Sequence, residues 1–412
     1  MSYLKGINRA WRIVRFGQIV AKAQYGLSLC ATPGGRYPML RMNNLHDGRI
    51  VPEDLVHVEL SDADLEYYRV HRGDILLNRT NSADLVGKAG VFDQPGDFVF
   101  ASYLVRFALQ ADLADPWFVG YWFDSARGKG RLRELATLGV SQCNINPTTL
   151  QKAFQLPLPS LAEQRKIAAI LGTWDRAIEK LQELVTAKSK RLRALRLQLL
   201  TGARRFPEFK KARWSTVRIG ELLCEVDRYV EFRDDASYKL ASIRRRSGGL
   251  FFREELSGHE IKTKVMKTIQ TGDFLLSKMQ VVHGAWGLVT AEFDGMFVSD
   301  SYIALVPRDQ SKLKVEFLDY LSRTRYLRHL AYLACHGVHI EKMTFNLTDF
   351  FHEKITIPST VEEQMKIVAT LTPGDREIEL LEKQLGLLKQ QKRGLMQKLL
   401  TGKVRLKPKE QQ

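Results

Sequence analysis

The sequence repeats itself at a spacing of 200 residues, and this repeat restricts the possible fold more than any other feature. Glu163-Gln164 returns as Glu363-Gln364, and Leu199-Leu200-Thr201-Gly202 returns as Leu399-Leu400-Thr401-Gly402. No gap is needed between these two matches. An internal repeat of this length predicts two copies of one structural unit, because each copy specifies the same local structure.

The repeat divides the chain into four parts along the sequence. We expect a first globular domain over residues 1–158, a central helical segment over 159–203, a second globular domain over 204–357 and a C-terminal helical segment over 358–412. The helical segments agree closely, whereas the globular domains share only short landmarks. Matched helices with different globular domains suggest one task that is performed on two different targets.

Both helical segments carry apolar residues at alternating spacings of four and three, which is the pattern of a coiled-coil seam. Because matched seams can cover one another, we predict that the two helices form an antiparallel coiled coil with a pseudo-two-fold internal repeat. A coiled coil that serves only to assemble the protein is the alternative. The first seam contains Ile167, Leu171, Trp174, Ile178, Leu181, Val185, Leu192, Leu195 and Leu199, and the second contains Ile367, Leu371, Ile378, Leu381, Leu385, Leu388, Leu395 and Leu399.

The helix ends are also marked in the sequence. Ser160 with Glu163, and Thr360 with Glu363, have the spacing of an N-terminal capping box. The Thr-Gly pair at the end of each segment is a C-terminal stop signal.

We expect one break within each helix. The expected positions are Gly172-Thr173 in the first copy and Pro373-Gly374 in the second. Basic residues then gather beyond the helix ends, where the helix dipole alone favours cations. A solvated basic face and a face that binds phosphate or a partner subunit both remain open for Arg204, Arg205, Lys403 and Arg405.

The formal net charge of +17 points to an anionic partner, and nucleic acid is the first candidate. A basic protein unrelated to nucleic acid is the alternative. The four cysteines are too widely spaced for a zinc or redox motif, which fits a reducing cytosol. No apolar run is long enough to span a bilayer, so we expect a cytoplasmic protein without membrane contact.

Each globular domain mixes short apolar alternations with turn signals, which predicts an α+β fold. We expect helices at residues 117–123 and 317–333. The expected strands lie at residues 75–77, 98–100, 103–107, 274–276 and 302–306.

Polar loops beside these strands are the candidates for contact with DNA. Arginine and asparagine can form paired hydrogen bonds with guanine and adenine edges, and lysine suits phosphate. An ordinary solvated loop is the alternative at any single position. The first domain offers Arg41, Asn43, Asn44, Arg79, Thr80, Asn81, Ser82, Lys88 and Tyr103, and the second offers Arg244, Arg245, Arg246, Lys278, Gln280, His283 and Tyr302.

The sequence carries no motif for catalysis. A phosphate-binding Gly-x-x-x-x-Gly-Lys loop is absent, and Asn146-Pro147 lacks the aromatic residue that an amino-methyltransferase motif needs. Glu208 with Lys210 follows a helix rather than a strand, and Cys335-His336 with His339 lacks a fourth ligand. We therefore expect no catalytic residue and no metal site, with an endonuclease of unrecognised metal site as the alternative.

Together these features resemble the specificity (S) subunit of type I restriction–modification enzymes. The most specific parts are Glu163-Gln164 and Glu363-Gln364, each followed by Leu-Leu-Thr-Gly, and the strand that begins at Gly73-Asp74 is also similar to the family. The resemblance covers nearly the whole chain.

The resemblance implies that each globular domain is a target recognition domain for one half of a bipartite, asymmetric site in double-stranded DNA. The paired helices would fix the spacing and dock two methyltransferase (M) subunits, which carry S-adenosylmethionine. Restriction (R) subunits, which use ATP and Mg, would join through the methyltransferases. The chain itself would be a non-catalytic subunit that binds no cofactor.

Overall fold

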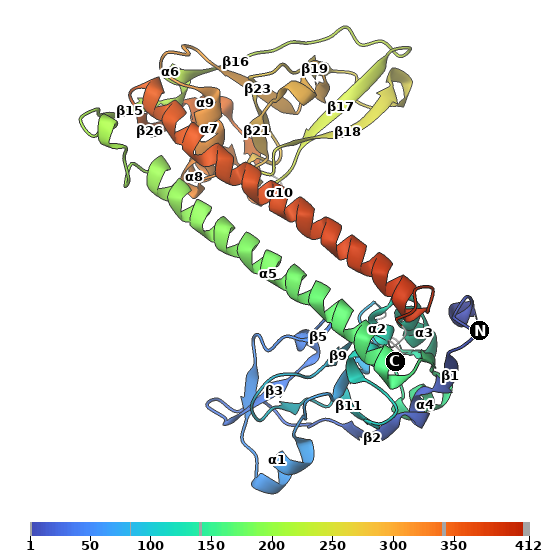
Figure 1. Ribbon diagram of the computed structural model, residues 1–412. Helices are drawn as coiled ribbons and strands as arrows, with labels where there is room; N and C mark the ends of the chain where they lie inside the picture. Colours follow the sequence, from blue (N-terminus) through green and yellow to red (C-terminus); the bar gives the residue numbers. More distant parts are fainter. Residues whose placement is uncertain (1, 83, 140–141, 340–342, 407–412) are drawn as a thin grey trace, which may run out of the picture. The chain divides into compact units, whose positions relative to one another are not determined.

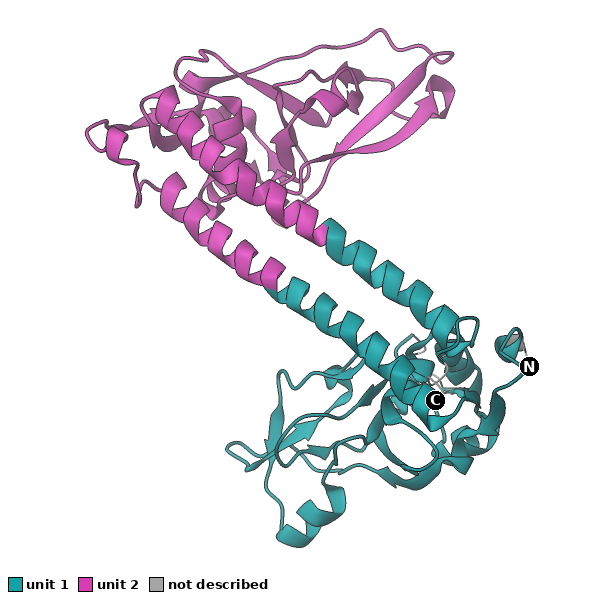
Figure 2. Ribbon diagram, viewed as in Figure 1, with its two compact units in different colours: residues 1–183, 383–412 teal, residues 184–382 magenta. Residues whose placement is uncertain are grey.

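The computed structural model describes residues 2–82, 84–139, 142–339 and 343–406, which form two compact units. Unit 1 comprises residues 1–183 and 383–412, and unit 2 comprises residues 184–382. Figure 2 shows that each long helix contributes one part to unit 1 and the other part to unit 2. The units therefore cut across the helices, and our four-part division along the sequence stays a prediction.

The two long helices are α5 (Leu161–Leu200) and α10 (Val361–Leu400), drawn green and red in Figure 1. Each runs for 40 residues without interruption, so the breaks expected at Gly172-Thr173 and Pro373-Gly374 are wrong. Pro373 removes one donor from the helix, but Pro373 and Ala369 are both exposed. Water can therefore satisfy the carbonyl that loses its partner, and the helix continues.

The helices pack antiparallel in both units. In unit 1, Ile167 and Leu171 near the start of α5 share a core with Leu399 near the end of α10. In unit 2, Leu199 near the end of α5 shares a core with Ile367 near the start of α10. Every residue of the two predicted seams is buried or half-buried. The predicted antiparallel pairing is confirmed.

The repeated Glu-Gln pair ties each helix start to its surroundings. Glu163 accepts a forked pair of hydrogen bonds from Arg405 (2.8 and 3.0 Å), and Glu363 accepts the same from Arg205 (2.9 and 2.6 Å). The carboxylates therefore engage an arginine beyond the other helix rather than closing a capping box. Ser160 caps α5 weakly at 3.4 Å.

The neighbouring glutamines hold the globular parts. The Gln164 amide accepts from the Asp115 N–H (2.9 Å) and donates to the Leu113 carbonyl (3.1 Å). Gln364 repeats this arrangement with the Lys314 N–H and the Lys312 carbonyl. One two-residue motif thus fixes a helix end and a globular part at the same time.

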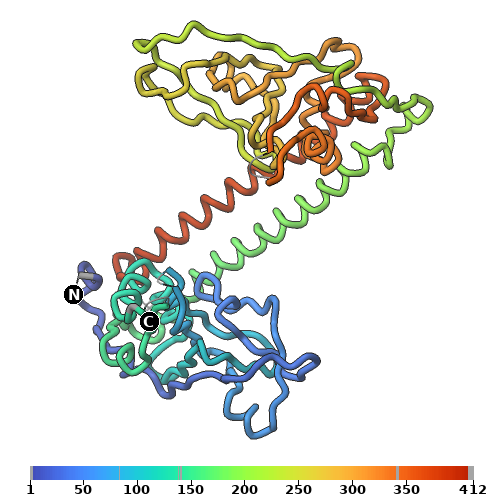
Figure 3. The backbone as a smooth tube through the Cα atoms, turned by 180° about the vertical axis from the view of Figure 1, so that it is seen from behind, coloured from blue at the N-terminus to red at the C-terminus, as the bar shows by residue number. Residues whose placement is uncertain are grey.

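The Thr-Gly pairs end the helices as expected. Gly202 and Gly402 have φ angles of +73° and +67°, the left-handed conformation that a terminating glycine adopts easily. The end of α10 lies near the start of the chain (Figure 3), and the Asn8 N–H donates to the Thr401 carbonyl (2.9 Å). Unit 1 is therefore built from both ends of the sequence.

The globular part of unit 1 contains a six-stranded mixed sheet with the order β2 (Val20–Tyr25), β11 (Leu104–Leu109), β7 (Ile75–Asn78), β9 (Ala89–Val91), β5 (Gly48–Ile50) and β4 (Leu45–His46). Smaller sheets join β10 (Val99–Phe100), β3 (Tyr37–Leu40) and β6 (Val56–Val58), then β12 (Thr137–Leu138), β13 (Cys143–Asn144) and β8 (Thr80–Asn81), and finally β1 (Arg12–Arg15) and β14 (Gln155–Leu158). The helices are α1 (Asp62–Tyr68), α2 (Pro116–Asp124), α3 (Ala126–Leu135) and α4 (Pro147–Ala153). Helix α2 packs against β5 and β9 and buries Trp122 and Phe123.

Unit 2 contains two four-stranded sheets. One has the order β16 (Leu223–Glu225), β23 (Tyr302–Pro307), β20 (Phe274–Ser277) and β21 (Trp286–Leu288), and the other has β18 (Leu250–Ser257), β17 (Ser237–Ile243), β22 (Phe297–Ser299) and β19 (Met266–Thr268). Two further pairs join β15 (Trp214–Arg218) to β26 (Lys354–Pro358) and β24 (Cys335–His336) to β25 (Thr344–Phe345). The helices are α6 (Ile219–Leu222), α7 (Val315–Ser322), α8 (Arg325–Leu333) and α9 (Leu347–His352).

The predicted α+β class is confirmed. The expected strands coincide with β7, β10, β11, β20 and β23, but the single helix expected at residues 317–333 is two helices, α7 and α8. The Thr324 hydroxyl accepts from the Leu327 N–H and begins α8 as a separate helix. Within the part of the chain that the structure describes, no helix has the length and hydrophobicity to cross a membrane.

Candidate nucleic-acid interface

The first recognition loop, residues 79–82, leaves the central strand β7 and pairs with β13. Its Arg79 side chain donates to the Asn144 side-chain oxygen (3.1 Å) and to the Ser102 carbonyl (3.2 Å). The guanidinium also lies over the ring of Tyr25, 5.0 Å from its centre. Arg79 is thus held in one orientation while remaining half-exposed, so binding a base edge would order it little further.

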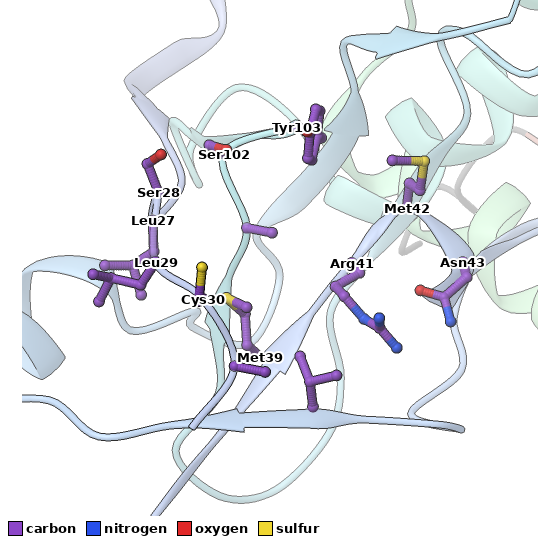
Figure 4. Close-up of a pocket in the computed structure, with 13 residues that line it drawn as sticks. Leu27, Ser28, Leu29, Cys30, Met39, Arg41, Met42, Asn43, Ser102 and Tyr103 are labelled. Atoms are coloured by element: carbon purple, nitrogen blue, oxygen red, sulfur yellow. The ribbon is translucent and has the colours of Figure 1, made fainter. Parts of the chain in front are cut away.

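A second stretch meets this loop from the side. The Asn81 amide donates to the Met42 sulfur (3.2 Å), which places Arg41 and Asn43 beside the first recognition loop. Arg41, Asn43 and Tyr103 line one cavity of about 470 Å³ (Figure 4). The structure therefore brings together candidates that lie 60 residues apart in the sequence.

This cavity combines apolar and polar chemistry. Leu29 and Tyr103 are 51% and 48% exposed, and Met39 and Met42 also line the cavity. The Arg41 guanidinium donates to the Asp54 carbonyl (2.7 Å), which fixes its position. An apolar surface beside fixed polar groups suits a base edge, since thymine presents a methyl group next to hydrogen-bonding atoms.

Two DNA-contact candidates of the first domain, Asn44 and Lys88, do not belong to the surface formed by the first recognition loop and this cavity. Asn44 is 1% exposed, and its amide donates to the carbonyls of Val51 (3.0 Å) and Glu53 (2.7 Å). The predicted DNA contact of Asn44 is therefore wrong, because the side chain is turned into the domain to hold a loop. Lys88 lines a different cavity, of about 170 Å³. Ser82 is exposed at the loop end.

The second recognition loop, residues 278–283, leaves strand β20 at the corresponding place in unit 2. The Lys278 N–H donates to the Ser301 carbonyl (2.9 Å), much as the Arg79 N–H donates to the Tyr103 carbonyl (3.0 Å). The backbones of the two loops are therefore anchored alike, while their side chains differ.

Lys278 lies near a carboxylate. Its ammonium is 4.0 Å from Asp300, which also accepts hydrogen bonds from Lys267 and Tyr229. Burial alone would raise the pKa of Asp300, but these hydrogen bonds bring the pKa below its ordinary value. Asp300 is therefore charged at neutral pH and offsets part of the charge of Lys278.

Arg244, Arg245 and Arg246 of unit 2 lie in the turn between β17 and β18, and all three are exposed. Arg246 and Ser247 adopt positive φ angles of 61° and 55°, which are uncommon for residues other than glycine. Their N–H groups donate to the carbonyls of His283 and Gly284, both at 2.7 Å. These bonds hold the strained turn against the second recognition loop, so the arginine turn and His283 form one surface.

Other candidates of unit 2 face inward. Tyr302 is half-buried and shares a hydrogen bond with the Ser242 hydroxyl (3.0 Å). The side-chain oxygen of Gln280 is buried and has no partner among the described residues. Tyr302 therefore supports strand β17 from within the unit rather than standing free at its surface.

Two supporting residues were missed by sequence reasoning, namely Tyr25 and Asn144. Tyr25 ends β2 and supports Arg79 from the ring face, and Asn144 reaches Arg79 and Thr80 from a strand 64 residues further on. Neither position carries a local sequence signal. Long-range strand pairing reveals their role, since β8 pairs with β13 at Asn144 and β2 pairs with β11 at Tyr25.

The side chains considered for metal binding are engaged otherwise. The Cys335 thiol donates to the Ala331 carbonyl (3.1 Å), and burial raises its pKa to about 11. His336 pairs with Asp349 at 2.6 Å. In the described residues, no three His, Cys, Asp or Glu side chains gather as a metal ion would require.

Comparison with known proteins identifies the family. The type I restriction modification DNA specificity domain matches twice, at residues 8–188 and 211–390. The MjaX specificity subunit of Methanocaldococcus jannaschii is 25% identical over 389 residues, covering 90% of this chain and 88% of that protein. The type I restriction enzyme MjaVIII specificity subunit of the same organism is 22% identical over 419 residues, covering 96% and 93%.

A solved structure supports the same fold. The S subunit of a type I restriction–modification system from M. genitalium superimposes with a TM-score of 0.62 at 15% identity, covering 96% of both chains. The chain belongs to the family of type I restriction–modification DNA specificity subunits. It is a sequence-specific DNA-recognition subunit and not itself an enzyme.

Proposed function

We propose that each unit recognises one half of a bipartite, asymmetric DNA site. The observation that carries this proposal is the pair of recognition loops at residues 79–82 and 278–283. Both leave a central strand and are anchored through a backbone N–H, yet one offers Arg-Thr-Asn and the other Lys-Met-Gln. Two loops at equivalent positions but with different side chains are what the recognition of two different half-sites requires.

Base contacts and phosphate contacts fall to different residues in this proposal. Arg79, Asn81 and Asn43 face base edges in unit 1, and each such contact contributes about 1–3 kcal/mol of discrimination. The exposed Arg244, Arg245 and Arg246 bind phosphates in unit 2. Phosphate contacts position the protein on DNA without specifying sequence, and they make binding depend on salt.

The chain directs partner subunits to this site. Two methyltransferase subunits would carry S-adenosylmethionine, and restriction subunits would join them with ATP and Mg. The methyltransferase must extrude the target base from the duplex, since the reacting atom is out of reach inside the stack. This chain contributes recognition and spacing, and binds no cofactor itself.

A methylation assay tests this proposal. The purified chain is combined with its partner methyltransferase and a library of random DNA, and modified molecules are sequenced. We expect one sequence with two specified halves and an unspecified spacer, modified only when both proteins are present. A single undivided site would contradict the two-reader proposal, and metal-dependent cleavage by this chain alone would contradict its non-catalytic role.

A further inference from the structure

Helices α5 and α10 share one register but differ at several positions where they face one another, and three of these lie around the retained aspartates. Trp174 corresponds to Gly374, Leu192 to Lys392 and Arg196 to Met396, whereas Asp175 is retained as Asp375. These differences occur within helices that otherwise repeat closely. They therefore raise the question whether the two helices are interchangeable in the pair.

In unit 1 the contact is a buried ion pair. The Lys392 ammonium bonds the Asp175 carboxylate, and both residues are less than a tenth exposed, at 7% and 8%. The Tyr121 hydroxyl donates to the other Asp175 oxygen (2.6 Å). Met396, one turn beyond Lys392, is 5% exposed and belongs to the apolar core.

In unit 2 the same place is packed differently. Leu192 fills the space beside Gly374, where a Cβ atom would lie 2.8 Å from one Leu192 methyl and 3.2 Å from the other. Asp375 pairs with Arg196 (2.6 Å) and with Arg323 (3.1 Å). Glycine thus makes room for leucine, and arginine replaces lysine as the cation.

We propose that α5 and α10 are complementary rather than interchangeable, so that α5 accepts α10 and rejects the α5 helix of a second copy of this chain. Pairing α5 with α5 would place the Trp174 indole against Leu192, where even one added carbon meets the leucine methyls.

Pairing α5 with α5 has a further cost. Arg196 would take the place of Met396, which is buried among apolar side chains. Pairing α10 with α10 is disfavoured differently, because Lys392 would replace Leu192 and leave the space beside Gly374 unfilled. Both exchanges lose contacts that only the mixed pair makes.

The consequence concerns specificity and rests on the proposed two-reader function. If α5 pairs with α10 and not with the α5 helix of a second copy, every helix pair joins the two different recognition loops. Two copies cannot exchange halves through α5 to produce a symmetric reader. The helices thus keep the recognised site asymmetric.

The full chain tests this complementarity through its melting temperature without DNA. The variant Lys392→Leu/Met396→Arg gives unit 1 the residues of α5, so that it imitates an α5–α5 contact. We expect the melting temperature to fall by about 10 °C, because the leucine introduced at position 392 would meet the Trp174 indole and the arginine introduced at position 396 would be buried among apolar side chains. The matched control Gln391→Arg/Gln397→Leu introduces α5 residues at exposed positions of the same segment and should leave the melting temperature unchanged.

Adding Trp174→Gly to the double variant supplies the Gly-Leu and Asp-Arg contacts of unit 2. We expect this triple variant to recover more than half of the lost melting temperature, or to fold where the double variant does not. A double variant as stable as the control would overturn the proposal, and so would a triple variant no better than the double. Because the readout involves no DNA, its failure would leave the proposed recognition of two half-sites intact.

Discussion

The helix ends and the recognition loops of this protein have diverged to very different degrees. At the helix ends, Glu163 with Arg405 and Glu363 with Arg205 form the same forked ion pair at the same place. After strands β7 and β20, the backbone anchors are alike but the side chains differ. The two copies thus keep the contacts that build the scaffold and vary the side chains of the loops that we propose to contact DNA.

The arginines of this protein fall into two sets, those that pair with buried carboxylates and those that lie exposed at the surface. Arg205 and Arg405 belong to the basic clusters that could have bound phosphate, yet both are committed to a buried carboxylate. Arg244, Arg245 and Arg246 are exposed in a turn, and none of the three pairs with a buried carboxylate among the described ion pairs. Net charge alone therefore overstates the DNA-binding surface, and the position of each arginine decides its role.

The largest expected effect comes from breaking the helix-end ion pairs. Arg205→Ala leaves Glu363, which is 1% exposed, without its cation, and we expect a loss of about 3 kcal/mol in the free energy of unfolding of unit 2. Arg405→Ala should cost unit 1 a similar amount. Denaturant titration measures both, with exposed Arg204→Ala as the control. Clearly unequal losses in the free energy of unfolding would show that the two helix ends are not equivalent.

A smaller effect distinguishes two adjacent asparagines. Asn44→Ala removes the amide that holds the Val51 and Glu53 carbonyls, and we expect it to cost about 1–3 kcal/mol of stability without changing the recognised sequence. Asn43→Ala should do the reverse, because Asn43 is exposed at the cavity. Thermal denaturation and methylation-site sequencing of both variants check this pair. A change of sequence preference in Asn44→Ala alone would contradict the assignment.

The helical half of the fold was predictable because its signals are local. Residues such as Ile167 and Leu171 recur at coiled-coil spacing, and Thr-Gly pairs end each helix. The continuity through Pro373 was not predictable, since it depends on the exposure of Ala369, which the sequence does not specify. The separation of α7 from α8 was missed because Thr324 lies within an otherwise helical pattern.

The recognition surface was only partly predictable. Arg79 and Asn81 carry a chemical signal of their own, and they lie on the surface as expected. Asn44 carries the same signal but faces inward, because carbonyls up to nine residues further on need its amide. The support of Arg79 by Tyr25 depends on long-range strand pairing, and no local sequence signal marks it.

The arginine turn offers a test through salt dependence. Each of Arg244→Ala, Arg245→Ala and Arg246→Ala should weaken binding to all DNA sequences and lower the slope of log affinity against log salt by roughly 1. Fluorescence anisotropy at several salt concentrations measures the slope. Exposed Arg376→Ala, within α10 and outside the turn, serves as the control and should leave the slope unchanged. A turn variant that alters sequence preference at constant slope would contradict a phosphate role.

The smallest effect is the pH dependence of unit 1. Burial alone would raise the pKa of Glu163, but hydrogen bonds from Arg405 and the Leu406 N–H lower the pKa below its ordinary 4.5. The stabilisation is therefore present above pH 4.5 and is lost as pH falls through the lowered pKa. The stability difference between the wild type and Glu163→Gln should shrink over that range. Exposed Glu362→Gln should show no such trend, and a constant difference for Glu163→Gln would contradict the assignment.

The central claim is that each unit recognises its own half-site, and one measurement tests it directly. The wild type, Arg79→Ala and Lys278→Ala are each combined with the partner methyltransferase and a random DNA library, and the modified sites are sequenced. We predict that Arg79→Ala relaxes specificity in one half only and Lys278→Ala in the other half only, with the spacer unchanged. A loss of specificity in both halves from either single variant would contradict the claim.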